Sequence, residues 1–213
     1  MLDLGPLDLT VPIIVLITTI IYLPITFIVL LKSLKFPQLT SRHAFQQAWF
    51  ERFWAFFGSA SKPLFANDVE AMLAEARGVV LDVGPGSGDW LYLFSPPRNK
   101  HISKLLLLEP NRNFHRALGM RAERLGLDGR YEIIEGGVKD FERMGIQTGT
   151  FDTITTVHVL CSVEAPQTLI KELYGYLKPG GQWLVYEHIK IRNEKTLAAL
   201  WQGESVGRNR VAF

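Results

Sequence analysis

The 213-residue sequence has very little cysteine and very little net charge. Cys161 is its only cysteine, which excludes an internal disulfide and zinc sites built on several thiolates. The formal net charge is +2 and no Lys/Arg run forms a basic stripe, so nucleic acid is not an expected partner. The five histidines lack the spacing of metal ligands, and no metal site is predicted. The composition that remains, 47% hydrophobic with both charge signs mixed, is typical of a folded chain.

Charge is absent altogether from residues 11–31, which read VPIIVLITTIIYLPITFIVLL. A helix of this length spans roughly 30 Å, the thickness of a hydrocarbon core. Asp3 and Asp8 precede it, where a cleaved signal peptide would carry basic residues. Three basic residues follow it, Lys32, Lys35 and Arg42. The sequence therefore predicts a membrane anchor over residues 1–35, with the rest of the chain in the cytosol.

Pro24 leaves the form of this anchor open. A proline in mid-helix removes a backbone hydrogen bond and is expected to kink or break the helix. A re-entrant or monotopic anchor is therefore an alternative to a straight crossing of the bilayer.

An aromatic segment follows the anchor in residues 36–62. Within it, LTSRHAFQQAWFERFWAFFG predicts a helix that Thr40 or Ser41 caps and Gly58 ends. Its aromatic side chains lie almost all the way round the helix. Such crowding suits the headgroup region of a membrane and packing on a folded domain equally well. The helix can do both if it covers a site that opens toward lipid.

Strands and helices alternate over residues 63–213. Strands are expected at residues 79–83, 105–108, 131–134, 153–159 and 183–186. Helices are expected at residues 67–77, 113–125 and 165–177. Short apolar strands that alternate with helices predict an α/β fold with a Rossmann-like, doubly wound and mostly parallel sheet.

The first strand runs into DVGPGSG, residues 82–88, with a glycine at every second position. In a doubly wound sheet, ligands bind at the carboxyl end of this strand. The glycines permit close backbone approach, and a following helix would present free N–H groups. A dinucleotide fingerprint requires G-x-G-x-x-G, whereas Asp89 follows Gly88 here. Asp82 together with a helix N-terminus suits a zwitterionic ligand better than a pyrophosphate.

The second strand ends in LLLLEP, which places Glu109 at the same edge, about twenty residues after the loop. A carboxylate at this place accepts hydrogen bonds from ribose hydroxyls in dinucleotide-binding folds. Either acid alone would fit a solvated loop carboxylate, and for a lone motif that interpretation would be preferred.

The D-x-G-x-G-x-G pattern at the end of a first strand resembles motif I of the class I S-adenosylmethionine-dependent methyltransferases. The resemblance implies S-adenosylmethionine as the cofactor. It implies a cofactor site made of Asp82, Gly84, Pro85, Gly86, Gly88, Glu109, Pro110, Val138 and His158.

Narrower pieces, LFANDVE, EPNRNF, VLCSV and LKPGGQWLVYEHI, are similar to the membrane-anchored methyltransferase-like seven group. Known members of that group methylate alkyl thiols and have a hydrophobic N-terminal anchor, placed on endoplasmic reticulum and lipid droplets. The resemblance covers residues 53–202 and implies an anchored enzyme whose catalytic domain faces the cytosol.

The sequence departs from this family in two places. The family has an acid after the third-strand glycine, whereas Val138 follows Gly137 here; Asp140 or the Val138 backbone is the expected substitute. The fold also adds a helix and an antiparallel strand pair after the fifth strand, and residues 203–213 match neither. We therefore expect a C-terminally truncated domain, from a truncated or mis-spliced gene product, whose fifth strand has an uncovered edge.

Methyl transfer from a sulfonium requires the protein mainly to align the acceptor and exclude water. A thiol acceptor ionises partly unaided, because its free pKa is about 8.5. His158 is the candidate base, and a histidine hydrogen-bonded at a strand end is the alternative. Cys161 is expected to be small and buried, Asp89 to approach the sulfonium or cap a helix, and His188 to be a weaker acceptor-side candidate.

The sequence thus predicts a membrane-anchored methyltransferase acting on a small apolar acceptor, an alkyl thiol in the first place. A lipid or quinone methyltransferase is the first alternative. A non-catalytic anchored protein that keeps the fold is the second, and a nucleotide oxidoreductase is disfavoured by the glycine spacing. The oligomeric state stays open.

Overall fold

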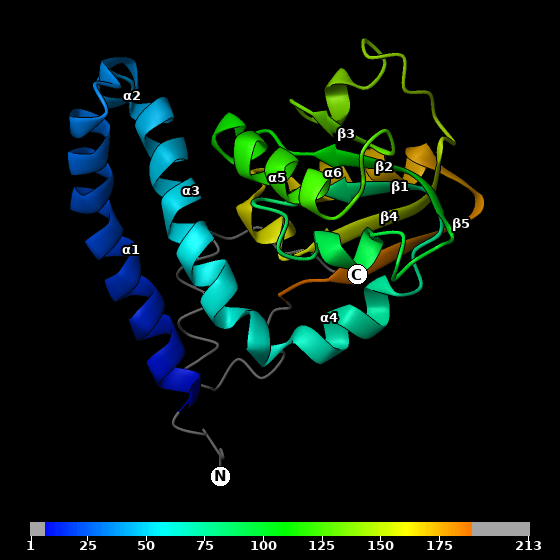
Figure 1. Cartoon of the computed structure of the whole chain (residues 1–213), viewed down its shortest axis with the longest axis horizontal. Helices are drawn as coiled ribbons and strands as arrows, with labels where there is room; N and C mark the ends of the chain where they lie inside the picture. Colours follow the sequence, from blue (N-terminus) through cyan, green and yellow to red (C-terminus); the bar gives the residue numbers. More distant parts are fainter. Residues whose placement is uncertain (1–6, 189–213) are drawn as a thin grey trace.

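A computed structural model of the chain describes residues 7–188 (Figure 1). Its helices are α1 (Leu7–Lys32), α2 (Phe36–Thr40), α3 (Arg42–Ser61), α4 (Ala66–Leu73), α5 (Arg112–Arg124) and α6 (Pro166–Tyr176). Its strands are β1 (Gly78–Val83), β2 (Ile102–Leu108), β3 (Tyr131–Ile134), β4 (Phe151–Val157) and β5 (Leu177–Tyr186). Short 3₁₀ turns are η1 (Lys62–Leu64), η2 (Leu91–Phe94), η3 (Val138–Asp140) and η4 (Leu160–Ser162). The predicted truncation concerns residues that lie largely outside this described part.

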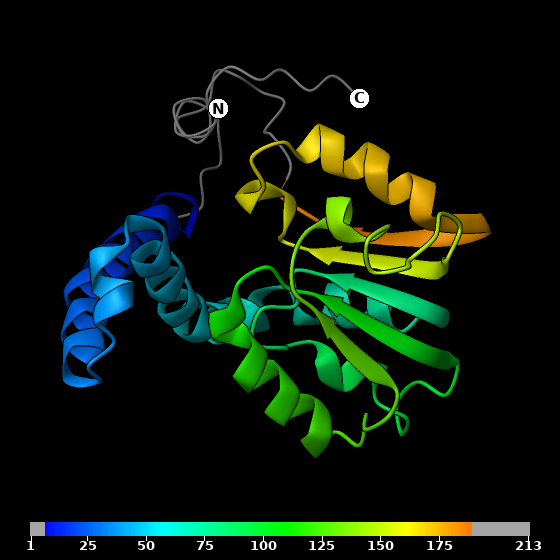
Figure 2. The ribbon, with the colours of Figure 1, turned by 90° about the horizontal axis from the view of Figure 1, so that it is seen from above.

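The strands form one parallel sheet in the order β3-β2-β1-β4-β5, so the predicted doubly wound fold is confirmed. Helices α4 and α5 cover one face and α6 covers the other (Figure 2). On β2, Leu105 and Leu107 belong to the α4/α5 core, whereas Leu106 and Leu108 belong to the α6 core. Because side chains alternate across a sheet that is covered on both faces, the strand reads as a continuous apolar run.

Several predicted boundaries are wrong for local reasons. Strand β4 ends at Val157 and not at residue 159, because His158 adopts a φ of +55°, which an extended strand does not allow. Ser41 caps α3 as expected, accepting the Ala44 N–H at 3.3 Å, but the helix continues past Gly58 to Ser61. The helix expected over residues 67–77 already ends at Leu73.

The helix predicted after the glycine loop is also absent from the described residues. A turn and then the 3₁₀ segment η2 follow the loop, so in the described part of the chain the loop does not lead directly into an α-helix. Pro96 and Pro97 come directly after Ser95, and a proline disfavours the α conformation in the residue before it.

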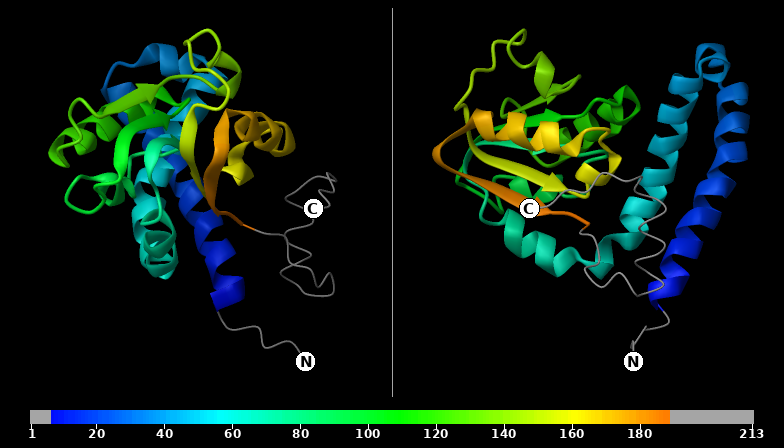
Figure 3. Two further views of the ribbon diagram at one scale, coloured as in Figure 1. Left: turned by 90° about the vertical axis from the view of Figure 1, so that its right-hand side faces the viewer. Right: turned by 180° about the vertical axis from the view of Figure 1, so that it is seen from behind.

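Helices α1 and α3 form an antiparallel hairpin, with α3 between α1 and the sheet (Figures 1 and 3). Helix α1 is continuous through Pro24, so of the expected kink or break, the break does not occur. The indole N–H of Trp49 donates to the Thr19 carbonyl oxygen at 3.1 Å, and the rings of Tyr22 and Phe56 lie 5.7 Å apart. The two helices are thus joined by specific contacts along their length.

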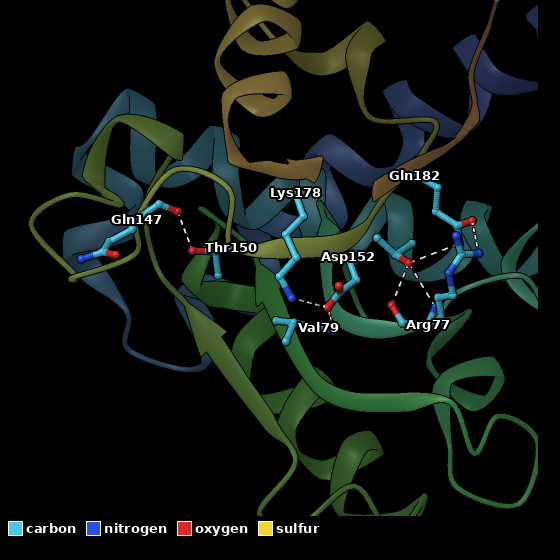
Figure 4. A network of polar contacts seen from close by, with 8 residues as sticks. Arg77, Val79, Gln147, Thr150, Asp152, Lys178 and Gln182 are labelled. Carbon is cyan, nitrogen blue, oxygen red and sulfur yellow. Dashed lines mark hydrogen bonds and ion pairs between the residues drawn. The ribbon is translucent and has the colours of Figure 1, made fainter. Parts of the chain in front are cut away.

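A polar network fastens the amino ends of β1, β4 and β5 to one another (Figure 4). The Asp152 carboxylate accepts the Val79 N–H at 2.8 Å and the Lys178 ammonium at 2.7 Å. Beside it, Thr153 Oγ1 accepts the Arg77 N–H at 3.1 Å and donates to the Arg77 carbonyl at 2.8 Å. Partial burial opposes ionisation, but the bonds from Lys178 and Val79 win and lower the pKa of Asp152. The network therefore stabilises the sheet at the edge away from the glycine loop.

Replacing Asp152 with alanine is expected to lower the free energy of unfolding by about 1–3 kcal/mol, because a backbone N–H and an ammonium lose their acceptor. Because the pKa of the Asp152 carboxyl is lower in the folded protein than in the unfolded chain, its contribution to stability is fully present above the unfolded-state pKa. It is lost as pH falls through the folded-state pKa. Chemical denaturation in detergent measures it. Glu132→Ala is the control, since it removes the Lys104–Glu132 pair, whose side chains are more than half exposed, and should cost less than about 1 kcal/mol. Equal losses in both variants would contradict a structural role for the network.

Candidate functional site

The glycine loop lies at the carboxyl end of β1, where the strand order reverses between β1 and β4. Two of its glycines are required by packing. A Cβ at Gly84 would lie 2.9 Å from the Val159 side chain, and a Cβ at Gly88 would lie 2.8 Å from Leu118. The loop therefore packs against Val159, which follows β4, on one side and against α5 on the other.

Gly86, unlike Gly84 and Gly88, is not packed against a side chain. Its φ is +57°, and a Cβ placed on it would meet no atom within 4 Å. Its N–H donates to Glu109 Oε2 at 2.9 Å. Gly86 thus presents backbone to open space at the switch point, where a ligand can approach the chain without meeting a side chain.

Two buried carboxylates lie at this edge of the sheet, Asp82 near the end of β1 and Glu109 directly after β2. Asp82 is only 7% exposed and accepts the Thr155 hydroxyl at 2.7 Å. Burial, opposed by the Thr155 hydrogen bond and assisted by the Glu109 charge, raises the pKa of Asp82 to about 7. Glu109, 5% exposed, accepts the N–H groups of Gly86 and Asn111, and burial nevertheless raises its pKa.

These features fit S-adenosylmethionine. A carboxylate offers about four lone-pair sites, so Asp82 and Glu109 each keep capacity beyond the bonds already made. An ammonium group and ribose hydroxyls are donors that such acids can accept. The open side of Gly86, whose N–H donates to Glu109, leaves room for the cofactor at this edge of the sheet.

His158 lies next to the loop, immediately after β4. Its backbone N–H donates to the backbone carbonyl oxygen of Tyr186 at 2.8 Å. Its ring lies 4.7 Å from that of Phe65 and stacks on His188 at 4.2 Å. Burial and then the neighbouring His188 lower the pKa of His158 to about 4, so the imidazole is neutral at physiological pH.

Cys161 is exposed, so the expectation of a buried cysteine is wrong. It sits in the short η4 turn, where its thiol contacts the His158 carbonyl at 3.5 Å. Partial burial of the sulfur, and then the Glu187 carboxylate, raise the pKa of the thiol. A neutral thiol beside a carboxylate is a poor nucleophile, which agrees with chemistry that needs no covalent intermediate.

The structure settles the geometry of three further predicted residues. Val138 is buried at the start of η3, and Asp140 turns back to accept the Gly137 N–H at 2.9 Å. Asp89 bonds to Arg121 on α5 and does not cap η2. Asp89 is therefore tied to α5 through its carboxylate, while its backbone carbonyl oxygen accepts the Lys62 ammonium at 2.6 Å.

Sequence reasoning missed the residues that join α3 to the site. Asn111 accepts the Asn113 N–H as the N-cap of α5, and its amide donates to the Gln47 carbonyl of α3 at 3.0 Å. The ring of Phe50 on α3 lies 6.5 Å from that of Phe114 in an edge-to-face arrangement. The cap could have been found from the N-R-N sequence after a strand. Its contact with α3 could not, because it joins segments far apart in the chain.

Comparison with known proteins agrees with this geometry. Residues 59–206 match a family described as a methyltransferase domain. Thiol S-methyltransferase TMT1B of Rattus norvegicus is 26% identical over 204 residues, which cover 92% of this chain and 77% of that protein. The ubiquinone/menaquinone biosynthesis C-methyltransferase UbiE of Hydrogenovibrio crunogenus is 29% identical over 113 residues, 53% of this chain and 43% of that protein.

A solved structure of a SAM-dependent methyltransferase from Aquifex aeolicus has the same fold. It matches 70% of this chain and 75% of its own length with a TM-score of 0.52 and 19% identity. An identity this low supports the fold and leaves the reaction to be argued from the site.

Proposed function

We infer the function of this chain from its family, because residues 59–206 show that it belongs to the methyltransferase domain family. Its cofactor is then S-adenosylmethionine. Our proposal is a membrane-anchored enzyme that methylates a small apolar acceptor, an alkyl thiol in the first place. The observation that carries the cofactor site is the open space at Gly86, whose N–H donates to the buried carboxylate of Glu109.

The proposed cofactor site is Asp82, Gly84, Pro85, Gly86, Gly88, Glu109, Pro110, Val138 and His158. When bound, S-adenosylmethionine supplies a methyl group already activated on a sulfonium. The protein's part is to hold both partners in line and to exclude water. The backbone at Gly86 and the two acids do the holding, and the close packing of Gly84 on Val159 keeps the loop fixed.

The surroundings of His158 favour an uncharged acceptor. Phe65, Tyr186 and His188 place aromatic or neutral imidazole rings against it. With its pKa lowered to about 4, His158 is too weak a base to deprotonate a thiol effectively. We therefore assign it a positioning role beside the acceptor and leave thiolate formation to the acceptor itself.

The purified chain in detergent is expected to transfer methyl groups to an alkanethiol, with kcat/KM rising about tenfold per pH unit between about pH 6 and 8, because the thiolate fraction rises in that proportion below the pKa of the thiol. No inflection should occur near pH 6.5, the usual range of a histidine base. Labelled S-adenosylmethionine, offered with an alkanethiol, a quinol and a sterol, measures this. His101→Gln is the control for His158→Gln, since His101 is exposed and lies at the opposite edge of the sheet.

An inflection near pH 6.5 that disappears in His158→Gln would contradict the positioning role and restore histidine as the base. Turnover of the quinol or sterol in place of the thiol would favour a lipid or quinone methyltransferase. The packing of the α1–α3 hairpin beside the cofactor site motivates that second candidate. A folded protein that does not bind S-adenosylmethionine would favour a non-catalytic anchored protein.

The proposed location is the cytosolic face of endoplasmic reticulum or lipid droplets. Its support is α1, in which residues Ile13–Lys32 are long and apolar enough to cross a membrane, with a mean hydropathy of 2.7. Lys32, Lys35 and Arg42 follow α1 and favour the cytosolic side.

A further inference from the structure

We propose that Glu187 is a positioning residue for methyl transfer, because its carboxylate holds the turn after β4, residues 158–162. That turn carries both His158 and the side chain that packs on the glycine loop. The inference rests on the methyltransferase activity proposed above and adds a residue to it. Glu187 directly follows β5, which pairs with β4 in the sheet (Figure 2), so it reaches this turn from the neighbouring strand.

The turn contains an uncommon backbone conformation. His158 has a φ of +55°, and Leu34 is the only other non-glycine residue with a positive φ in the described part of the chain. A residue in this region is strained and persists only where the surrounding structure holds it. Such positions cluster at binding and active sites, where the direction of a side chain has to be fixed. The turn therefore requires contacts that hold it in place.

The carboxylate of Glu187 supplies two of these contacts. One oxygen accepts the backbone N–H of Val159 at 3.0 Å, and the other accepts that of Leu160 at 3.1 Å. These N–H groups directly follow His158 at the start of η4, where the first N–H groups of a helical turn have no acceptor within the turn. The backbone N–H of His158 itself donates to the Tyr186 carbonyl oxygen. Three consecutive N–H groups are thus bonded to the end of β5.

A carboxylate suits this place better than an amide of the same length. It offers only acceptors, so both of its oxygens can face N–H groups, whereas a glutamine would turn an NH₂ donor toward one of them. Burial raises the pKa of Glu187, against the bonds from Val159, Leu160 and the Thr156 side chain. Burial of this charge is therefore unfavourable in itself, and its contribution is the fixed position of the turn.

The turn places His158 beside the proposed acceptor. The His158 ring packs edge-to-face on Phe65 at 4.7 Å and lies 5.3 Å from the Tyr186 ring. His188, the residue after Glu187, stacks on the same imidazole at 4.2 Å. Two consecutive residues at the end of β5 therefore hold the turn, one through its backbone and the other through its ring.

The same turn reaches the glycine loop through Val159. A Cβ placed on Gly84 would lie 2.9 Å from the Val159 side chain, so the turn and the loop are in direct contact. The loop is tied to the sheet at this point, because the Gly84 N–H donates to the Leu108 carbonyl oxygen at 2.8 Å. A shift of the turn therefore changes the position of His158 relative to the loop. Methyl transfer requires donor and acceptor to be aligned, so such a shift lowers its rate.

Glu187→Gln is expected to lower kcat for an alkanethiol about tenfold at saturating S-adenosylmethionine, because the turn shifts and the acceptor is misaligned. The dissociation constant of S-adenosylmethionine should stay within about threefold of the wild-type value, since the bond between Glu109 and the Gly86 N–H does not involve Glu187. Methylation assays with labelled cofactor, at a temperature where both proteins are folded, measure kcat. Calorimetric titration measures binding.

Glu164→Gln is the matched control. Glu164 lies two residues after η4 and is exposed, so the same change there should leave kcat and binding as in the wild type. A kcat of Glu187→Gln equal to that of the control would contradict the proposal. A loss of cofactor affinity as large as the loss of kcat would also contradict it, because general disruption of the site would then be the cause.

His158→Gly tests whether Glu187 acts through the turn. Glycine adopts a positive φ without strain, and the variant also lacks the ring that the turn positions. Glu187→Gln should therefore cost less in kcat on the His158→Gly background than on the wild-type background. Equal fold losses on both backgrounds would overturn the proposal, because the effects of independent residues multiply.

Amide hydrogen exchange separates failure of this proposal from failure of the proposed function, because it requires no turnover. In the ligand-free protein, Glu187→Gln is expected to speed exchange about tenfold in a peptide that covers Val159 and Leu160, and to leave β3 unchanged. Unchanged exchange at the turn would overturn the role of Glu187 even in an active methyltransferase. Faster exchange, with a wild type that methylates no thiol, quinol or sterol, would reject the proposed function and with it a role in methyl transfer.

Discussion

Gly86→Arg is expected to abolish binding of S-adenosylmethionine, weakening the dissociation constant by at least about a hundredfold, or roughly 3 kcal/mol. The loop packs on both sides, but Gly86 faces open space, and its N–H donates to Glu109. A side chain there would fill the space into which the cofactor must fit. Calorimetric titration of S-adenosylmethionine into the detergent-purified protein measures the loss.

Gly126→Arg is the matched control for this result. Gly126 has a φ of +69°, and a Cβ on it would also meet no atom within 4 Å. It follows α5, outside the proposed cofactor site, so both variants impose a similar backbone strain of roughly 1–2 kcal/mol. The control should bind as the wild type does. Loss of binding in both would show that strain, and not occupation of the Gly86 space, is responsible, and unchanged binding in Gly86→Arg would contradict the site.

Much of the fold was predictable because burial on both faces leaves a clear trace in the sequence. The β3 strand was predicted with its observed bounds, and β2 appeared as an apolar run because both of its faces are covered. The end of β4 was not predictable, because the positive φ of His158 has no composition signal in a non-glycine residue. The missing helix after the loop was predictable in principle from Pro96 and Pro97.

The candidate site was predictable as a set of residues but not as an arrangement. Loop spacing indicated all three glycines, yet only tertiary contacts distinguish Gly84, which packs on Val159, from Gly86, which faces open space. The exposure of Cys161 likewise depends on the turn that carries it. The α1–α3 hairpin could not be predicted from the sequence for a related reason. A helix that is aromatic almost all round does not indicate which side meets lipid and which meets protein.

Asp82 also affects the stability of the folded protein, and its replacement by asparagine is expected to raise the free energy of unfolding at pH 8. Burial raises the carboxyl pKa from 3.8 to about 7 in the folded state. Between these values the folded protein binds more protons at this site than the unfolded chain, so this residue's contribution to stability falls as pH rises. Three pKa units correspond to roughly 4 kcal/mol, which is the upper limit of the effect.

The asparagine variant removes the charge and keeps an oxygen that can accept the Thr155 hydroxyl. Its melting temperature should match the wild type near pH 4 and exceed it progressively up to pH 8, measured by thermal denaturation of the ligand-free protein in detergent. Asp128→Asn, at an exposed position, should follow the wild type at every pH. Lower stability of Asp82→Asn at pH 8 would contradict an unfavourable buried charge.

The same variant should bind S-adenosylmethionine more weakly at pH 8, because a neutral amide replaces the carboxylate proposed to accept from the cofactor. Gain of stability and loss of affinity in one substitution would identify Asp82 as a residue kept for binding at the expense of the fold. A cationic ligand near Asp82 would favour the ionised carboxyl and lower its pKa. Proton release on cofactor binding, measured near pH 7 by titration in buffers of different ionisation enthalpy, is therefore expected in the wild type and should diminish in Asp82→Asn.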